Sequence, residues 1–227
     1  LRPEKLDDLV GQTHLIGEWK PIRKFIEAGR LPSILFWGPP GCGKTSIARV
    51  IATSLDAEFF HLSWVLSKKE DVVKIISKAQ KNYQDGRQTI LFLDEIHRWS
   101  KSQQDVLLPW VEKGIITLIG ATTENPSFTV INALLSRCRT YILKEISEEE
   151  ILRFLMKNKE RIQERYPKMV IQADENLKLI SHLGNGDMRN TMNLLETACI
   201  LQWEWNLTRE SILESGGKSL VYDANGE

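Results

Sequence analysis

A glycine-rich segment of the sequence has the residue types and the spacing of a phosphate-binding loop. Its residues fit the pattern G-x-x-x-x-G-K-[ST] and are Gly38, Pro39, Pro40, Gly41, Cys42, Gly43, Lys44 and Thr45. Glycines let such a loop wrap around an anion without Cβ clashes, so that successive backbone N–H groups point inward. The lysine of this pattern reaches the β- and γ-phosphates of a nucleotide, and the hydroxyl ligates Mg²⁺. We therefore expect Lys44 to bind phosphate and Thr45 to bind the metal; the alternative is a turn that only joins a strand to a helix.

Two adjacent carboxylates, Asp94 and Glu95, follow the apolar run Ile90–Leu93. Ligands of parallel sheets bind at the carboxyl ends of buried strands, where this pair is expected to lie. We expect Asp94 to hold Mg²⁺, through water, and Glu95 to polarise the attacking water as general base. An acidic pair that caps a helix is the alternative. His97 follows closely, but a lone histidine is more often packed or solvated, so it is given no chemical role.

The elements that must position these residues alternate along the first two thirds of the chain. Short, continuously apolar runs predict strands buried on both faces, and the stretches between them predict helices. The predicted strands are Ser33–Trp37, Glu58–Leu62, Thr89–Leu93, Thr117–Ala121 and Thr140–Leu143, and the predicted helices are Lys44–Leu55, Glu70–Tyr83 and Gln103–Val111. This alternation indicates an α/β fold, with a parallel sheet and helices on both sides.

The last third of the sequence changes to successive amphipathic helices. Ser147–Glu150 has the pattern of a capping box, with a hydroxyl at the cap and a carboxylate three residues later. A second helix is predicted to begin at Asp174 and to end at the Gly-Asn-Gly turn 184–186, where glycine favours a left-handed cap. Asp187 and Thr208 are suitable caps for a third and a fourth helix.

The composition is that of an ordinary folded protein. Of 227 residues, 42 % are hydrophobic and 26 % are charged, which excludes a disordered or collagen-like chain. Thirty Lys and Arg balance thirty Asp and Glu, so any binding to nucleic acid or membrane has to be local. No apolar run approaches the roughly 20 residues of a membrane span.

Three cysteines, Cys42, Cys138 and Cys199, are too few and too widely spaced to predict a disulfide framework or a zinc site. We therefore expect a reducing, intracellular environment. The chain opens at Leu1 without an apolar leader, so no secretory signal is visible, and the missing initiator methionine indicates a fragment.

Two arginines are candidates for a further catalytic cation. Hydrolysis at a phosphate loop is slow until such a cation, often an arginine from a neighbouring subunit, neutralises the γ-phosphate. Arg137 lies just before the last predicted strand, and Arg189 lies at the start of the helix capped by Asp187. From the residues alone, a surface position without a chemical role is an equal alternative for either.

Four strings of the sequence together resemble one branch of the AAA+ ATPases. They are Trp37–Gly41, Thr89–Arg98, Lys101–Asp105 and Gly120–Phe128. The branch is the replication-associated recombination protein A family, which includes the Werner helicase-interacting protein of eukaryotes. The resemblance covers nearly the whole chain. It implies an AAA+ P-loop NTPase core over residues 1–146, a small α-helical lid over 147–215 and, over 216–227, a linker or the truncated start of a C-terminal oligomerisation region.

The resemblance also implies roles for individual residues. Val10 and Gly11, followed by Gln12, are similar to the segment that frames adenine. Thr123 is similar to the sensor 1 residue near the γ-phosphate, and Asn125 is the second choice for that role. Arg137 is similar to the arginine finger of clamp loaders, which acts on the ATP of an adjacent subunit. Arg189 is similar to the sensor 2 arginine of the lid, which contacts the nucleotide of its own subunit.

The function implied by the resemblance is a Mg²⁺-dependent ATPase that assembles with copies of itself. It would act on DNA at stalled forks, ends or gaps, including junctions of single and double strands, together with replication or recombination proteins. The host sets its location, which is the cytoplasm and nucleoid in a bacterium and the nucleus in a eukaryote. The alternatives are a nucleotide-switched scaffold for such partners, a clamp-loader subunit or a branch-migration motor.

Three tryptophans depart from the pattern of the family. They are Trp64, Trp99 and Trp110. We favour packing in the core or the lid as their role, and the alternative is that some of these rings stack on unpaired bases.

Overall fold

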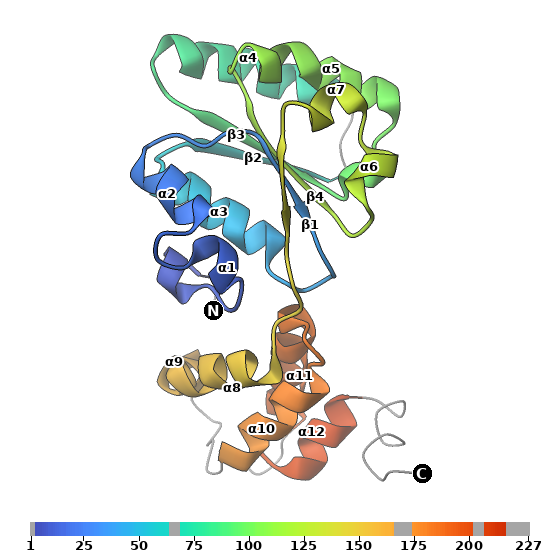
Figure 1. The fold of residues 1–227 in the computed structure, drawn as a ribbon. Helices are drawn as coiled ribbons and strands as arrows, with labels where there is room; N and C mark the ends of the chain where they lie inside the picture. The colour runs from blue at the N-terminus through green and yellow to red at the C-terminus, as the bar shows by residue number, and fades with distance from the viewer. Residues whose placement is uncertain (1–2, 64–68, 166–173, 202–206, 217–227) are drawn as a thin grey trace. The chain divides into compact units, whose positions relative to one another are not determined.

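The computed structural model describes residues 3–63, 69–165, 174–201 and 207–216 (Figure 1). The chain divides into two compact units, one that ends at Lys144 and one that begins at Glu145. Within the described ranges, no helix is both long enough and apolar enough to cross a membrane.

The first unit is built on a parallel sheet of five strands in the order β2-β3-β4-β1-β5. The strands are β1 (Ile34–Trp37), β2 (Glu58–Ser63), β3 (Thr89–Asp94), β4 (Thr117–Thr122) and β5 (Arg139–Ile142). Successive residues of β1 enter different cores, because Ile34 and Phe36 pack on one face of the sheet and Leu35 packs on the other. All five predicted strands are present, and the predicted α/β fold is confirmed.

Helices cover both faces of this sheet (Figure 1). One face carries α1 (Thr13–Ile16), α2 (Pro21–Glu27) and α3 (Lys44–Ser54), and the other carries α4 (Lys69–Gln84), α5 (Lys101–Glu112) and α7 (Asn132–Leu135). Shorter turns of helix are η1 (Leu6–Asp8), η2 (Ile96–Arg98) and α6 (Pro126–Thr129). The three predicted helices are present as α3, α4 and α5, whereas the short elements were not predicted.

Two of the three unusual tryptophans pack in the core on the face of the sheet that α4, α5 and α7 cover. Trp99 is buried in the same cluster as Leu107, and Trp110 packs against that cluster. The interpretation of these rings as packing residues is therefore confirmed for Trp99 and Trp110. Trp64 lies outside the described residues.

The second unit is helical. Its described helices are α8 (Glu148–Lys157), α9 (Lys159–Arg165), α10 (Asp174–Leu183), α11 (Met188–Ile200) and α12 (Arg209–Ser215). The predicted caps are confirmed, because the side chains of Ser147, Asp187 and Thr208 each accept a bond from a backbone N–H in the first turn. Helix α9 was not predicted. The predicted linker 216–227 lies outside the described residues, apart from Gly216 at the end of α12.

Candidate functional site

The glycine-rich loop connects the end of β1 to the start of α3. Gly41 (φ 67°) and Gly43 (φ 98°) have left-handed backbone, which glycine adopts without strain. Gly38 is required by close packing, because a Cβ there would lie 2.6 Å from the carbonyl oxygen of Leu143. Gly43 is the N-cap residue of α3, and no side chain caps this helix. The first N–H groups of α3 are therefore left for another acceptor, as in anion sites at helix N-termini.

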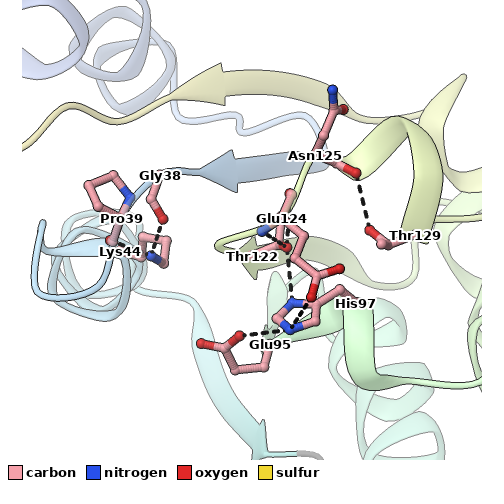
Figure 2. A network of polar contacts seen from close by, with 9 residues as sticks. All are labelled: Gly38, Pro39, Lys44, Glu95, His97, Thr122, Glu124, Asn125 and Thr129. Atoms are coloured by element: carbon pink, nitrogen blue, oxygen red, sulfur yellow. Dashed lines mark hydrogen bonds and ion pairs between the residues drawn. The ribbon is translucent and has the colours of Figure 1, made fainter.

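Lys44 is held inside this loop. Its Nζ donates hydrogen bonds to the carbonyl oxygens of Gly38 and Pro39, both at 2.7 Å, and the residue is 8 % exposed (Figure 2). A buried ammonium whose partners are neutral carbonyls can turn to phosphate oxygens, because bonds between two charged groups are stronger. Cys42 is buried and Pro40 is exposed, and Thr45 follows as a half-buried residue in the first turn of α3.

The two carboxylates lie where β3 ends. Asp94 is the last residue of the strand, and Glu95 has left-handed backbone (φ 51°). This conformation is uncommon for residues other than glycine, and such strain clusters at functional sites. His61 Nε2 lies 3.9 Å from Asp94 Oδ2. Burial lowers the pKa of His61, although the charge of Asp94 acts in the opposite direction, so this imidazole is mostly neutral at pH 7 and leaves the Asp94 charge available for a cation.

The end of β4 lies between the loop and the acidic pair. Thr122 is opposite Trp37 in the register of β4 and β1, and its carbonyl oxygen accepts a hydrogen bond from Gly38 N at 3.1 Å. Of the two sensor 1 candidates, Thr123 directly follows β4 and is exposed. Asn125 caps α6, and its Oδ1 accepts from Ser127 N at 3.0 Å. The loop, the acidic pair and both sensor candidates thus lie at the same side of the sheet, where the parallel strands end. We call this side the carboxyl edge.

His97, which received no role from the sequence, joins two parts of this edge. Its Nδ1 lies 3.0 Å from Thr122 Oγ1, and its Nε2 lies 3.2 Å from Glu95 Oε2 and 3.6 Å from Glu124 Oε1 (Figure 2). The side chain is only 7 % exposed. Its place three residues after Asp94 was the only available signal, because contacts with β4 leave no local pattern in the sequence.

Gln12 attaches the N-terminal segment to the loop. Its Nε2 donates to the carbonyl oxygens of Cys42 at 3.3 Å and Lys144 at 2.6 Å, and its Oε1 accepts from Lys144 N at 3.0 Å. Gln12 is 5 % exposed. Val10 and Gly11, which precede it, are therefore tied close to the phosphate loop. The contact with adenine remains a prediction for both.

Arg137 lies at the opposite side of the sheet, the amino edge, where the parallel strands begin. The parallel register places Arg139 beside Ile34, at the amino end of β1, whereas the phosphate loop begins at the carboxyl end of that strand. Arg137 Nη2 forms an ion pair of 2.6 Å with Glu112 Oε1, and its Nη1 donates to Ala133 O at 2.7 Å. Burial raises the pKa of the adjacent Cys138 thiol to about 12, so this thiol stays protonated beside the guanidinium.

Arg189, the predicted sensor 2 residue, lies in the second unit. It is exposed in the first turn of α11, directly after the cap Asp187. The first unit therefore brings together every predicted site residue except the two arginines.

A family model described as "ATPase family associated with various cellular activities (AAA)" matches residues 34–146, which include the loop, the acidic pair and Arg137. Replication-associated recombination protein A of Escherichia coli K12 is 47 % identical over 86 % of this chain. The chain belongs to the AAA family. Within the family it belongs to the branch of replication-associated recombination protein A, since the Coxiella burnetii protein of that name is 43 % identical over 98 % of the chain. The ATPase WRNIP1 of Dictyostelium discoideum is 38 % identical over 96 % of it.

A solved structure shares the fold of this chain. The Thermotoga maritima RuvB Holliday junction branch migration motor is 25 % identical, with a TM-score of 0.72, and the match covers 94 % of this chain and 71 % of that one. The chain spans less than half of the curated relatives named above, at 44 %, 48 % and 25 % of their lengths.

Proposed function

We propose that the chain binds ATP with Mg²⁺ and hydrolyses the γ-phosphate. The convergence of the glycine-rich loop, Lys44, Asp94 and Glu95 at the carboxyl edge of one parallel sheet carries this proposal. In this proposal the residues up to about 146 form the nucleotide-binding core, and residues 147–215 form the lid.

The residues at this edge suit a triphosphate with a magnesium ion. The uncapped start of α3 and the buried ammonium of Lys44 offer donors to phosphate oxygens. In the described part of the chain, no group of three or more His, Cys, Asp or Glu side chains is placed to hold a metal. Mg²⁺ does not need such a cluster, because it usually takes one or two carboxylates and fills its other positions with phosphates and water. Asp94 and the hydroxyl of Thr45 supply the oxygen ligands that this ion prefers.

Each predicted residue has a task in the proposed reaction. Mg²⁺, when bound, would neutralise charge on the phosphates. Lys44 holds the phosphates, and Glu95 accepts the proton of the attacking water. Thr123, with Asn125 as second choice, contacts the γ-phosphate. Val10 and Gly11 frame the adenine, and Arg189 contacts the nucleotide from the lid.

Arg137 is proposed to act on a neighbouring subunit. It lies before the amino end of β5, while its own phosphate loop is at the carboxyl end of β1, a strand of four residues that is about 13 Å long. A second copy of the chain that presents Arg137 to this loop would supply the cation that a phosphoryl-transfer site needs. The proposed state is therefore an assembly, as is general in the family.

The wider role rests on the relatives. We propose that this ATPase works in DNA replication, recombination and repair, at forks, gaps or ends, together with proteins of those pathways. It would then be found with the DNA, in the bacterial nucleoid or the eukaryotic nucleus. Strong stimulation of turnover by forked or gapped DNA at a stated salt concentration supports this role. A flat response, with capture of protein partners that depends on nucleotide, favours a nucleotide-switched scaffold instead.

The test of hydrolysis is Glu95→Gln. We expect this variant to bind Mg·ATP within about threefold of the parent in calorimetry and to lose at least about a hundredfold in turnover, because the amide cannot accept the proton. Glu27→Gln, at an exposed carboxylate at the end of α2, is the matched control and should change neither value. Unchanged turnover in Glu95→Gln would show that another group is the base, and the absence of ATP binding by the parent would overturn the proposal.

A further inference from the structure

The chain reverses direction directly after the acidic pair, and this reversal places His97. The left-handed backbone of Glu95 ends β3 and begins η2. Ile96 is fully buried and anchors the turn against β4, where a Cβ on Gly120 would lie 3.1 Å from Ile96 Cδ1. Glycine at that position makes room for Leu35, whose Cδ2 would lie 2.5 Å from that Cβ, and for Ile96. His97, the next residue, is thereby carried back toward the end of β4.

The imidazole of His97 has a different partner at each nitrogen. Nε2 faces the carboxylates of Glu95 and Glu124, which only accept hydrogen bonds when ionised, so the proton belongs on Nε2. Nδ1 faces the hydroxyl of Thr122, which is fully buried. That hydroxyl also accepts from Glu124 N at 3.0 Å, and its single proton has two acceptors within reach, His97 Nδ1 and the carbonyl oxygen of Glu124 at 3.1 Å. These contacts shape the turn that follows β4.

We propose that His97 is a positioning residue, which holds the Glu95 carboxylate in a fixed place relative to the segment 122–125 and to the phosphate loop. The proposal rests on the proposed function, in which Glu95 is the base and this segment contacts the γ-phosphate. From the ring, contacts continue to Thr122, whose carbonyl oxygen accepts from Gly38 N. Gly38 O in turn accepts from Lys44 Nζ (Figure 2). The lysine that binds phosphate and the carboxylate that activates water are thus tied to the same strand end.

The need for such a residue follows from the freedom of a glutamate side chain. The Glu95 side chain is 36 % exposed, and without a partner it would populate several rotamers. A general base must lie within hydrogen-bond reach of the water, and a misplacement of about 1 Å can cost roughly a hundredfold in rate. His97 is itself buried, so it can hold one orientation and impose it on Glu95.

The first experiment compares three variants of His97 by ATPase kinetics. His97→Ala should lower kcat about tenfold to a hundredfold, and KM and the Kd for Mg·ATP should stay within about threefold, because only the water-activating group moves. His97→Gln should recover much of kcat, because its amide reaches the place of Nε2. His97→Asn is the matched control: its amide reaches only the place of Nδ1, toward Thr122, so kcat should stay low. Equal kcat in the Gln and Asn variants would overturn the proposal, even if His97→Ala fails to fold.

A second experiment separates this proposal from the proposed function. If His97 acts through Glu95, then adding His97→Ala to Glu95→Gln should lower the residual turnover by less than about twofold. A further tenfold loss in the double variant would mean that His97 acts by another route. If the parent hydrolyses ATP, Glu95→Gln does not, and His97→Ala keeps full kcat, then only the His97 proposal fails. If Glu95→Gln retains turnover, the assignment of the base fails first.

Discussion

The two edges of the sheet hold polar side chains in opposite ways. At the carboxyl edge, His97 and Thr122 are 7 % and 0 % exposed, and the contacts of these side chains join β4 to η2 and to Glu95, the residue that follows β3. At the amino edge, Arg137 and Glu112 form one ion pair, and their side chains are 40 % and 42 % exposed. Removing the partner of a buried polar group lowers the stability of the folded protein, because that group is left without a hydrogen bond. An exposed ion pair contributes little, because water can replace either partner.

This difference matches the tasks proposed for the two edges. Groups that must lie within a fraction of an ångström of one another benefit from a buried network with a single arrangement. An arginine that has to reach the phosphate of another subunit benefits from a partner that it can leave at small cost. The predictions below test whether the carboxyl edge is fixed and the amino edge is exchangeable.

The largest effect is expected from Arg137→Ala. Turnover of the assembled protein should fall about a thousandfold, because an arginine supplied by a neighbour contributes at least that factor in phosphoryl transfer. ATP binding, measured by calorimetry, should stay within about threefold of the parent. Arg139→Ala is the matched control. Arg139 is also exposed and lies two residues after Arg137, but it stacks on the ring of Phe25, so its replacement should leave turnover unchanged.

Mixing two inactive variants tests whether Arg137 acts in trans. Arg137→Ala retains Glu95, and Glu95→Gln retains Arg137, so a mixed assembly contains some interfaces with both residues intact. We expect the mixture to regain turnover that neither variant shows alone. No recovery in a mixture shown to co-assemble, or a loss of ATP binding in Arg137→Ala as large as the loss of turnover, would contradict a role in trans.

A change in stability is expected from Gln12, at the carboxyl edge. Gln12→Ala leaves Lys144 N and two carbonyl oxygens without their buried partner, which should lower the free energy of unfolding by about 1–3 kcal/mol in urea denaturation. Gln12→Glu keeps the shape but turns a carboxylate oxygen toward the carbonyl oxygens of Cys42 and Lys144. Its loss should be at least as large. A change below about 0.5 kcal/mol in both would show that this edge tolerates lost contacts.

The sequence was sufficient for the features that depend on local pattern. The strands were predictable because continuous apolar runs such as Ile90–Leu93 suit burial on both faces of a sheet. The phosphate loop was predictable because all of its residues are contiguous in the sequence, so their types and spacing alone indicate phosphate binding. The caps Ser147 and Asp187 were predictable because a capping side chain bonds the backbone only three residues away.

Features that depend on distant contacts were not predictable. The contact of His97 with Thr122 spans 25 positions, and that of Gln12 with Lys144 spans 132. Neither leaves a periodic signal in a single sequence. Helix α9 was missed because Ile162 is the only apolar residue among its seven, so it has no amphipathic stripe. The ion pair of Arg137 with Glu112 joins two elements through exposed side chains, and no pattern of apolar residues records it.

The smallest effect is expected from Glu112→Gln, which removes the ion pair and leaves the bond from Arg137 to Ala133 O. Exposed pairs of this kind usually contribute less than about 1 kcal/mol to stability. The free energy of unfolding, measured in urea, should therefore change by no more than about 0.5 kcal/mol. Turnover of the assembled protein should change by less than about twofold, because the partner's phosphate replaces Glu112 in the active state. A tenfold loss of kcat would mean that Glu112 orients Arg137 for catalysis. Both edges would then be fixed networks, and exposure alone would not distinguish an exchangeable contact from a positioning one.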